Sequence, residues 1–185
     1  MRSLWLITLF SLVCCPILGC ASDATSMNDE GYEAMDMQAA AGRADRILDD
    51  VLNEIKPPLQ WAHGPTSLGG CDVSRMRVVM TVVSLDRRGS FLGIVDRYWR
   101  DTGYRITSVN KDVEFPAIYA RTADGFGVSL SFGGKGQAFF EADSPCVEKS
   151  EVAESTTPPN GPAYEGVYPL PRPNIRSPFW SAGAP

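Results

Sequence analysis

The chain has 185 residues, of which 17 are Lys or Arg and 22 are Asp or Glu, so its formal net charge at pH 7 is −5. This acidic balance argues against nucleic-acid binding, which usually requires a net basic surface. The length allows one domain with a substantial core but hardly two such domains.

The first 20 residues have the layout of an export signal. Arg2 precedes an apolar stretch from Leu4 to Leu18 that is too short to span a membrane comfortably. The stretch ends in Ile17-Leu18-Gly19-Cys20, which resembles the lipobox of bacterial lipoproteins. In that family the Cys thiol is acylated and cleavage makes this Cys the first residue. The resemblance therefore implies a signal peptide over 1–19 and lipidation at Cys20; simple secretion is the alternative.

The resemblance also implies a location for the protein. Arg outnumbers Lys 13 to 4, a bias typical of GC-rich coding sequences. With the lipobox and a pair of exported cysteines, the chain resembles the small lipoproteins that actinobacteria export. A lipoprotein of a single-membrane bacterium stays on the outer face of the cell membrane. We therefore expect a lipid-anchored protein whose partners are the membrane and components of the envelope.

A tether and a helix are expected next. Residues 20–33 are mostly polar, which is typical of a flexible tether. The globular domain is expected over 34–147. It opens with apolar residues at helical spacing, and this predicts a helix that ends before Pro57. These residues are Met37, Ala40, Ala44, Ile47, Leu48, Val51, Leu52 and Ile55.

The rest of the domain alternates loops with β-rich segments. Residues 59–70 contain Pro and Gly and predict a loop. Residues 76–85 are β-rich and, except at their start, apolar on both faces, which predicts an interior strand. Asp86 is expected to cap a second helix, and Gly103 to end it in the left-handed conformation. Four short strands are then expected at 104–110, 117–122, 126–132 and 137–142, with turns at Asp124-Gly125 and at Gly133 to Gly136.

Two cysteines help to choose a topology. Cys71 and Cys146 are the only ones left once the signal peptide and the lipidated Cys20 are set aside, and two thiols pair by default in an oxidising compartment. A disulfide brings the start of the 76–85 strand to the end of the 137–142 strand. We therefore predict an α+β, two-layer fold with two helices on one face of a five-stranded, mainly antiparallel sheet. Its expected strand order is 104–110, 117–122, 126–132, 137–142, 76–85.

The C-terminal residues differ from the domain in composition. Residues 148–185 are rich in Pro, Glu, Ser and Thr. Such a stretch is typical of a disordered tail, partly in the polyproline II conformation. Its aromatic residues could anchor it to a partner, but a solvated extension is the simpler expectation.

The expected sheet has a polar face that is the main candidate site. Alternation sends Met76, Val78 and Met80 toward the helices, and three Arg residues with hydroxyl groups to the opposite side. A basic face of this kind suits an anionic envelope component or another exported protein, with Arg77, Arg105, Tyr119 and Arg121 as ligand-binding candidates. The alternative is a polar face that is merely solvated. The whole predicted face is Arg77, Thr81, Arg105, Thr107, Tyr119, Arg121, Ser129 and Ser131.

Signs of catalysis are weak by comparison. His63 is the only histidine and no Cys-x-x-Cys spacing occurs, so neither a metal nor a cofactor is predicted. The Gly133 to Gly136 turn is not a phosphate-binding loop, and Asp49 and Asp50 are expected on a solvated helix face. We therefore favour a non-enzymatic binding module. An envelope hydrolase or transferase with an unrecognised site, built around His63 and a carboxylate, and a purely structural envelope protein remain as alternatives.

Overall fold

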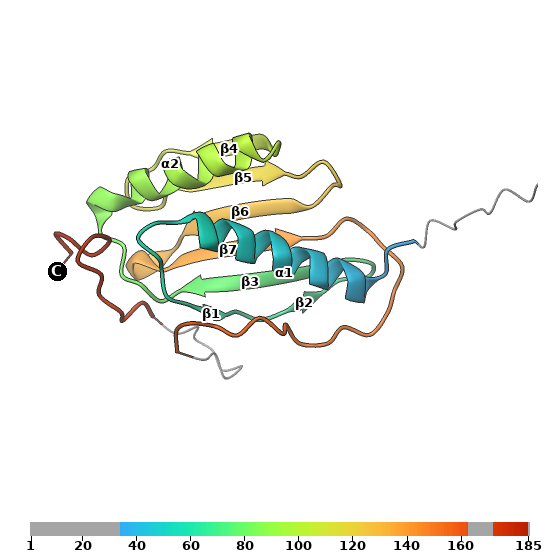
Figure 1. The fold of residues 1–185 in the computed structure, drawn as a ribbon. Coiled ribbons are helices and arrows are strands. Elements are labelled where there is room, and N and C mark those ends of the chain that lie inside the picture. The colour runs from blue at the N-terminus through green and yellow to red at the C-terminus, as the bar shows by residue number, and fades with distance from the viewer. Residues whose placement is uncertain (1–33, 163–171, 185) are drawn as a thin grey trace, which may run out of the picture. The chain divides into compact units, whose positions relative to one another are not determined.

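The computed structural model describes residues 34–162 and 172–184 (Figure 1). The expected signal peptide, the lipidation residue Cys20 and the tether lie outside the described residues. Two helices, α1 (Met37–Glu54) and α2 (Leu85–Asp101), lie on one face of an antiparallel sheet. Its strands are β1 (Trp61–His63), β2 (Ser67–Leu68), β3 (Val73–Val79), β4 (Arg105–Asn110), β5 (Ala117–Arg121), β6 (Gly127–Phe132) and β7 (Ala138–Asp143).

The predicted α+β class is confirmed, whereas the strand number is corrected from five to seven. The order is β1-β3-β7-β6-β5-β4, with β2 also paired to β3. The five expected strands thus follow the expected order, with β3 antiparallel to β7. The two additional strands, β1 and β2, form within the segment that we expected to be a loop. They pair with the edge of β3, which would otherwise expose unpaired backbone groups.

The helix boundaries follow local chemistry. The Asp36 side chain caps α1 by accepting from the Ala39 N–H at 2.7 Å. The N-cap of α2 is Ser84, and Asp86 lies inside the first turn, so the expected Asp86 cap is corrected by two residues. Gly103 follows α2 with φ +84°, the left-handed conformation that was predicted for it. Among the described residues, no helix has the length and apolar character needed to cross a membrane.

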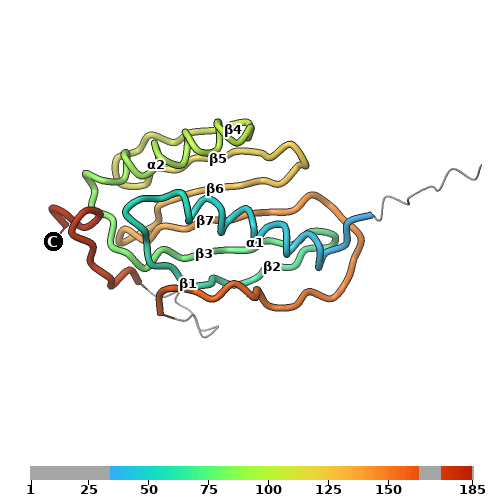
Figure 2. The backbone as a smooth tube through the Cα atoms, in the orientation of Figure 1, coloured from blue at the N-terminus to red at the C-terminus, as the bar shows by residue number. Residues whose placement is uncertain are grey.

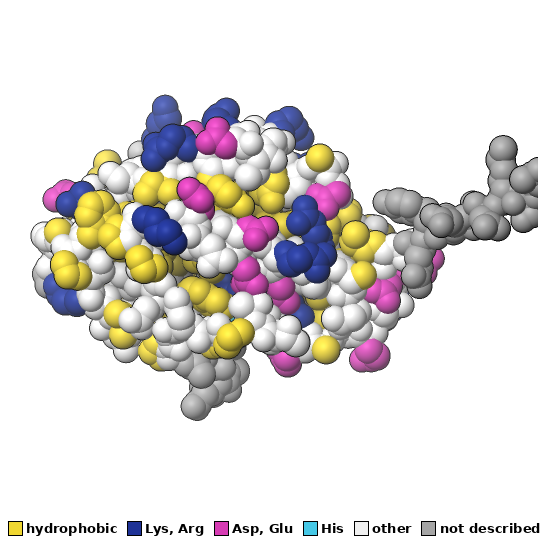
Figure 3. Space-filling view, viewed as in Figure 1, with side chains coloured by type: hydrophobic (Ala, Val, Ile, Leu, Met, Phe, Trp, Pro, Cys, Tyr) yellow, Lys and Arg dark blue, Asp and Glu magenta, His cyan; other side chains and the backbone are white. Residues whose placement is uncertain are grey.

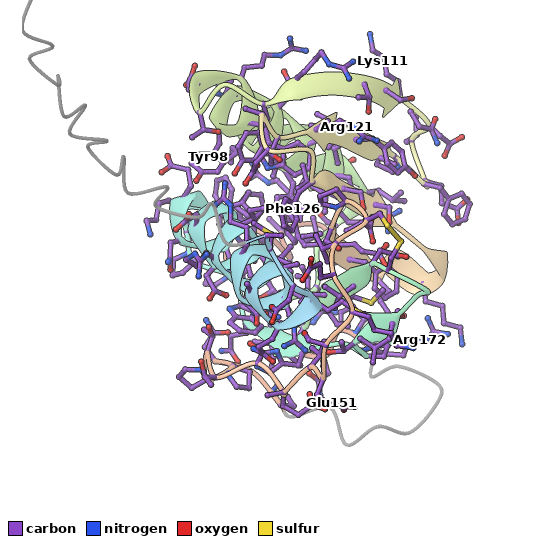
Figure 4. The ribbon with its side chains drawn as sticks, turned by 90° about the vertical axis from the view of Figure 1, so that its right-hand side faces the viewer. Tyr98, Lys111, Arg121, Phe126, Glu151 and Arg172 are labelled. Carbon is purple, nitrogen blue, oxygen red and sulfur yellow. A yellow bond between two sulfur atoms is a disulfide. The ribbon has the colours of Figure 1, made fainter. Side chains whose placement is uncertain are left out.

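The main core lies between the helices and the sheet. Phe91 of α2 contacts Phe132 and Phe140 in edge-to-face geometry. Phe126 is fully buried on the side of the sheet that α1 covers (Figure 4). The predicted pair of Cys71 and Cys146 forms a disulfide with Cα atoms 4.8 Å apart. It links the residues just before β3 to the residues just after β7.

The alternation along β3 is the reverse of our expectation. Val73 and Val79 belong to the main core with the helices, so Arg75 and Arg77 also face the helix layer. Met76, Val78 and Met80 instead face the other side of the sheet, where Ala62, Phe139 and Ile175 complete a second, smaller core. The hydrophobic pattern favoured Met76, Val78 and Met80 for the main core because the alternate positions carry Arg75 and Arg77. The pattern chose wrongly because both faces of β3 are covered and α1 supplies carboxylates for the two arginines.

The C-terminal residues also correct our expectation. Residues 148–162 and 172–184 lie along the domain instead of extending into solvent as a disordered tail (Figure 1). The Val82 N–H donates to the Ile175 carbonyl at 2.8 Å, and Trp180 is fully buried, with its indole N–H donating to Pro57. Single anchoring residues thus hold a stretch whose average composition is too polar for it to fold alone.

Candidate functional site

Three of the four predicted ligand-binding residues lie together on the sheet face opposite the helices. Arg105 on β4 is directly opposite Arg121 on β5, and Tyr119 points to the same face two residues before Arg121. All three are exposed, Tyr119 to 43%. We call Arg105, Tyr119 and Arg121 the basic patch.

The basic patch contains an uncompensated pair of like charges. Directly opposed like charges in an antiparallel sheet are destabilising. Within the described part of the chain neither Arg105 nor Arg121 forms an ion pair, and Arg121 only donates to the Gly125 carbonyl at 3.3 Å. On the far side of Arg121 the cross-strand neighbour is Gly127, which has no side chain. The two guanidinium groups are therefore available to an external anion.

The same sheet face also has an acidic half, which we did not predict. Glu141 and Asp143 on β7 point to this face, in register with Ser129 and Gly127 of β6. Burial, reinforced by the charge of Asp143, raises the pKa of the Glu141 carboxyl above its ordinary value, although a hydrogen bond from Ser74 at 3.1 Å opposes the shift. Sequence alternation alone places both acids here and could have found them. The face is thus basic on β4 and β5 and acidic on β7.

Arg77 does not belong to this face, which corrects its assignment as a ligand residue. Its side chain is fully buried, and its Nη2 atom lies 2.8 Å from Asp45 Oδ1 and 3.2 Å from Asp49 Oδ1 on α1. Arg75 joins the cluster with Nε 3.3 Å from Asp45 Oδ2. The guanidinium of Arg77 also stacks 4.8 Å from the centre of the Trp61 ring. Asp49 is therefore not simply part of a solvated helix face.

The buried cluster holds the segment 148–162 in place. Arg75 donates to the Ala153 carbonyl at 2.6 Å, and the Thr157 hydroxyl donates to Asp49 at 2.6 Å. A signal for this cluster exists in the sequence, because Asp45 falls within the apolar stripe of α1 among alanines and leucines. An acid on that stripe requires a buried cation as its partner.

His63 lies beside this cluster and links β1 to the segment 148–162. Its Nε2 atom is 2.8 Å from the Thr157 carbonyl oxygen, and its ring meets Trp61 edge-on. Because a carbonyl only accepts, Nε2 carries the proton of the neutral ring and Nδ1 holds the free lone pair. Burial, together with the charge of Arg77, lowers the His63 pKa, so the ring is neutral at neutral pH. These contacts indicate a structural histidine.

A groove lies between α2 and β4 on the helix side of the sheet. It encloses about 680 Å³, and its walls combine apolar residues such as Leu85, Leu92, Val109 and Val113 with charged ones such as Asp96 and Arg100. Leu85 and Val113 are 52% and 76% exposed. Of the buried polar atoms that lack a partner within the described structure, none belongs to a residue that lines the groove, so the groove does not specify a ligand's chemistry.

Other chemistry is sparse in the described part of the chain. Between residues 34 and 162, and from 172 to 184, no group of three or more His, Cys, Asp or Glu side chains is arranged to hold a metal ion. Burial and the charges of Asp50 and Glu54 raise the pKa of Tyr98 to about 12, so its phenol stays protonated. On the helix-covered face, acidic and basic side chains are interspersed (Figure 3). The basic patch differs from that face because its two arginines have no ion-pair partner among the described residues.

Comparisons of the chain with known protein families, with curated proteins and with solved structures find no match.

Proposed function

We propose that the protein is a lipid-anchored module of the cell envelope that binds an anionic envelope polymer through the basic patch. The observation that carries the proposal is the cross-strand pair of Arg105 and Arg121, which has no ion-pair partner in the described chain. Guanidinium groups match carboxylate and phosphate oxygens in geometry and charge. An anion bridging the two would relieve the repulsion that the sheet imposes on them.

The residue composition of the basic patch favours a polymer over a folded protein as the partner. Stable protein interfaces usually bury an apolar or aromatic centre. The basic patch offers a single aromatic ring, that of Tyr119. The exposed apolar residues Val109 and Val113 do not extend the patch, because they line the groove on the helix side. A small charged patch binds weakly by itself. Many copies anchored in one membrane through Cys20, however, would bind a repeating polyanion with much higher avidity.

The acidic half of the face limits where on the sheet an anionic polymer can bind. Glu141 and Asp143 lie two strands away from the arginines of β5 and repel an anionic chain. We therefore expect the polymer to lie along β4 and β5, near the edge of the sheet, without crossing β7. Because the attraction is electrostatic and exposed, binding should weaken as salt is raised.

The test compares two double variants of equal charge change on intact cells. Arg105→Gln/Arg121→Gln removes the basic patch, whereas Arg46→Gln/Arg97→Gln removes two exposed arginines from the helices. Both should keep the melting temperature within a few degrees, since exposed substitutions usually change stability by about 0.5 kcal/mol or less. Only the patch variant should lose capture of the polymer by crosslinking, and by several-fold.

Equal capture by both variants would show that the face is merely solvated. Protease treatment of the captured material identifies the class of partner. If the treatment destroys the captured species, the partner is an acidic exported protein and the polymer assignment is wrong.

A further inference from the structure

A pocket of about 630 Å³ lies at the N-terminal end of α2, and none of its lining residues belongs to the basic patch. Its walls come from four parts of the chain: residues 82–88, Glu114 in the loop between β4 and β5, the turn between β6 and β7, and the C-terminal segment that includes Asn174 and Ala184. Figure 2 shows this segment, in dark red, beside the start of α2. We call this cavity the α2 pocket. The basic patch and the lipid anchor account for none of its features.

Ser84, the N-cap of α2, lines the pocket with a hydroxyl that has no partner. The residue is 4% exposed, and within the described chain its Oγ atom makes no hydrogen bond. An N-cap serine normally accepts from an N–H of the first turn, but this one does not. Its backbone N–H donates to the Trp180 carbonyl at 2.9 Å, which fixes the residue in position. A buried hydroxyl without a partner costs free energy that a ligand could recover.

Arg88, one turn further along α2, contributes a second buried polar atom without a partner. The residue is 7% exposed and lines the same pocket, and its Nε atom has no hydrogen-bond acceptor in the described structure. Its Nη1 atom donates to the Glu114 carbonyl, and the guanidinium lies 5.1 Å from the centre of the Phe132 ring. These contacts hold the guanidinium in place without neutralising its charge, and no carboxylate among the described residues forms an ion pair with it.

The backbone of the turn between β6 and β7 passes close to the Arg88 side chain. Gly136 has φ +71°, and a Cβ atom there would lie 2.8 Å from Arg88 Nη2. Lys135 precedes it with φ +59°, a left-handed conformation that is uncommon for a residue with a side chain. The backbone can therefore pass close to the guanidinium only because residue 136 is glycine.

Two buried side-chain atoms that line this pocket lack a partner within the described chain, and both can donate hydrogen bonds. They are the Ser84 hydroxyl and the Arg88 Nε–H, and the N–H groups of Leu85 and Asp86 in the first turn of α2 also have no acceptor within the helix. The helix N-terminus adds a partial positive charge. A ligand here must therefore supply acceptor oxygens and a negative charge. Among the lining residues, Asp86 and Glu114 oppose a second negative charge, whereas Lys135 and Arg176 favour one. This balance suits a monoanion better than a dianion.

We propose that the α2 pocket binds a small carboxylate-bearing ligand, whose oxygens accept from the Ser84 hydroxyl and the Arg88 guanidinium. This site is independent of the proposed polymer binding. Because Ser84 is fixed by Trp180 and the far wall belongs to the C-terminal segment, ligand binding also tightens the contact between that segment and α2.

The test is a titration of the purified full chain with sodium acetate, followed by nuclear magnetic resonance. Inorganic phosphate and chloride serve as the competing anions, at matched ionic strength. We expect acetate to shift the Arg88 Nε–H signal and the backbone amides of Leu85 and Asp86 in a saturable way. Chloride should leave all three signals unchanged. A saturable response to phosphate alone would overturn the carboxylate assignment, and no saturable response to any anion would overturn the site.

Ser84→Ala separates binding from folding. Removal of a hydroxyl without a partner should leave the melting temperature of the ligand-free protein unchanged or slightly higher. It should weaken acetate binding about tenfold, the usual effect of losing one hydrogen bond to a charged group. Ser90→Ala, at an exposed position of the same helix, is the matched control and should bind acetate like the parent protein. A lower melting temperature for Ser84→Ala, or unchanged binding, contradicts the proposal.

Discussion

The Nη2 atom of Arg77 on β3 lies 2.8 Å from Oδ1 of Asp45 on α1, and both side chains are almost completely removed from solvent. A buried ion pair of this kind contributes little compared with a well-packed apolar pair. Its loss by removal of one partner, however, leaves a buried charge unpaired. The pair therefore fixes how α1 is placed on the sheet more than it adds to overall stability.

We predict that Arg77→Gln lowers the free energy of unfolding by about 3 to 5 kcal/mol, because Asp45 and Asp49 lose their principal cation. Chemical denaturation measures this change. Arg46→Gln, at the exposed position next to Asp45, is the control and should change stability by no more than about 0.5 kcal/mol. If Arg77→Gln is as mild as Arg46→Gln, the guanidinium lies in solvent and β3 presents its opposite face to the helices.

The disulfide gives a second prediction. Cys71 and Cys146 are 75 residues apart in the sequence, so cross-linking them restricts the unfolded chain strongly. Loop-closure entropy sets an upper estimate of about 4 to 5 kcal/mol for the stabilisation. We expect thiol titration of the native protein over residues 34–185 to detect neither cysteine until the protein is denatured and reduced. We also expect the Cys71→Ser/Cys146→Ser variant to melt at a clearly lower temperature. Native free thiols at either position would contradict the pairing.

Cys20 gives a prediction about location. If the lipobox resemblance holds, Cys20→Ala prevents acylation, and the protein is released from the membrane fraction. Metabolic labelling with a fatty acid and fractionation of the cells measure both effects. Cys71→Ser is a suitable control because it removes a thiol elsewhere in the chain and should leave acylation intact. Unchanged membrane attachment of Cys20→Ala would rule out this anchor.

Glu141 gives a prediction about pH. Its pKa is raised in the folded protein, so the folded state binds this proton more tightly than the unfolded state. The resulting stabilisation is present at low pH and is lost as pH rises from the ordinary carboxyl pKa through the folded one. Glu141→Gln keeps an acceptor for Ser74 and should therefore raise the melting temperature at neutral pH. The gain should shrink below about pH 4, where Glu141 is protonated in both states.

Thermal melts at several pH values test this behaviour, with Glu154→Gln as an exposed control. A stabilisation by Glu141→Gln that does not change with pH would show that its cause is packing and not the carboxyl charge.

Local chemistry alone determined the helices and most of the strands. The apolar spacing of α1, the stop at Pro57, the glycine at position 103 and the Asp124-Gly125 turn each depend on neighbours a few residues away. The order of the five main strands also followed, because a disulfide between Cys71 and Cys146 restricts which strand ends can meet. Even the open face of β4 and β5 was predicted, since those strands alternate between apolar and polar residues.

Only the tertiary structure decided which side of β3 faces the helices. Both faces of this strand end up buried, so the arginines on one face did not mark that face as exposed to solvent. The choice depends on Asp45 and Asp49, which lie about 30 residues earlier and supply partners for Arg77. The placement of the C-terminal residues also depends on contacts far apart in the sequence, because Trp180 donates to the Pro57 carbonyl and Thr157 donates to Asp49. The α2 pocket likewise brings together Ser84, Gly136 and the C-terminal segment, whose proximity no local pattern encodes.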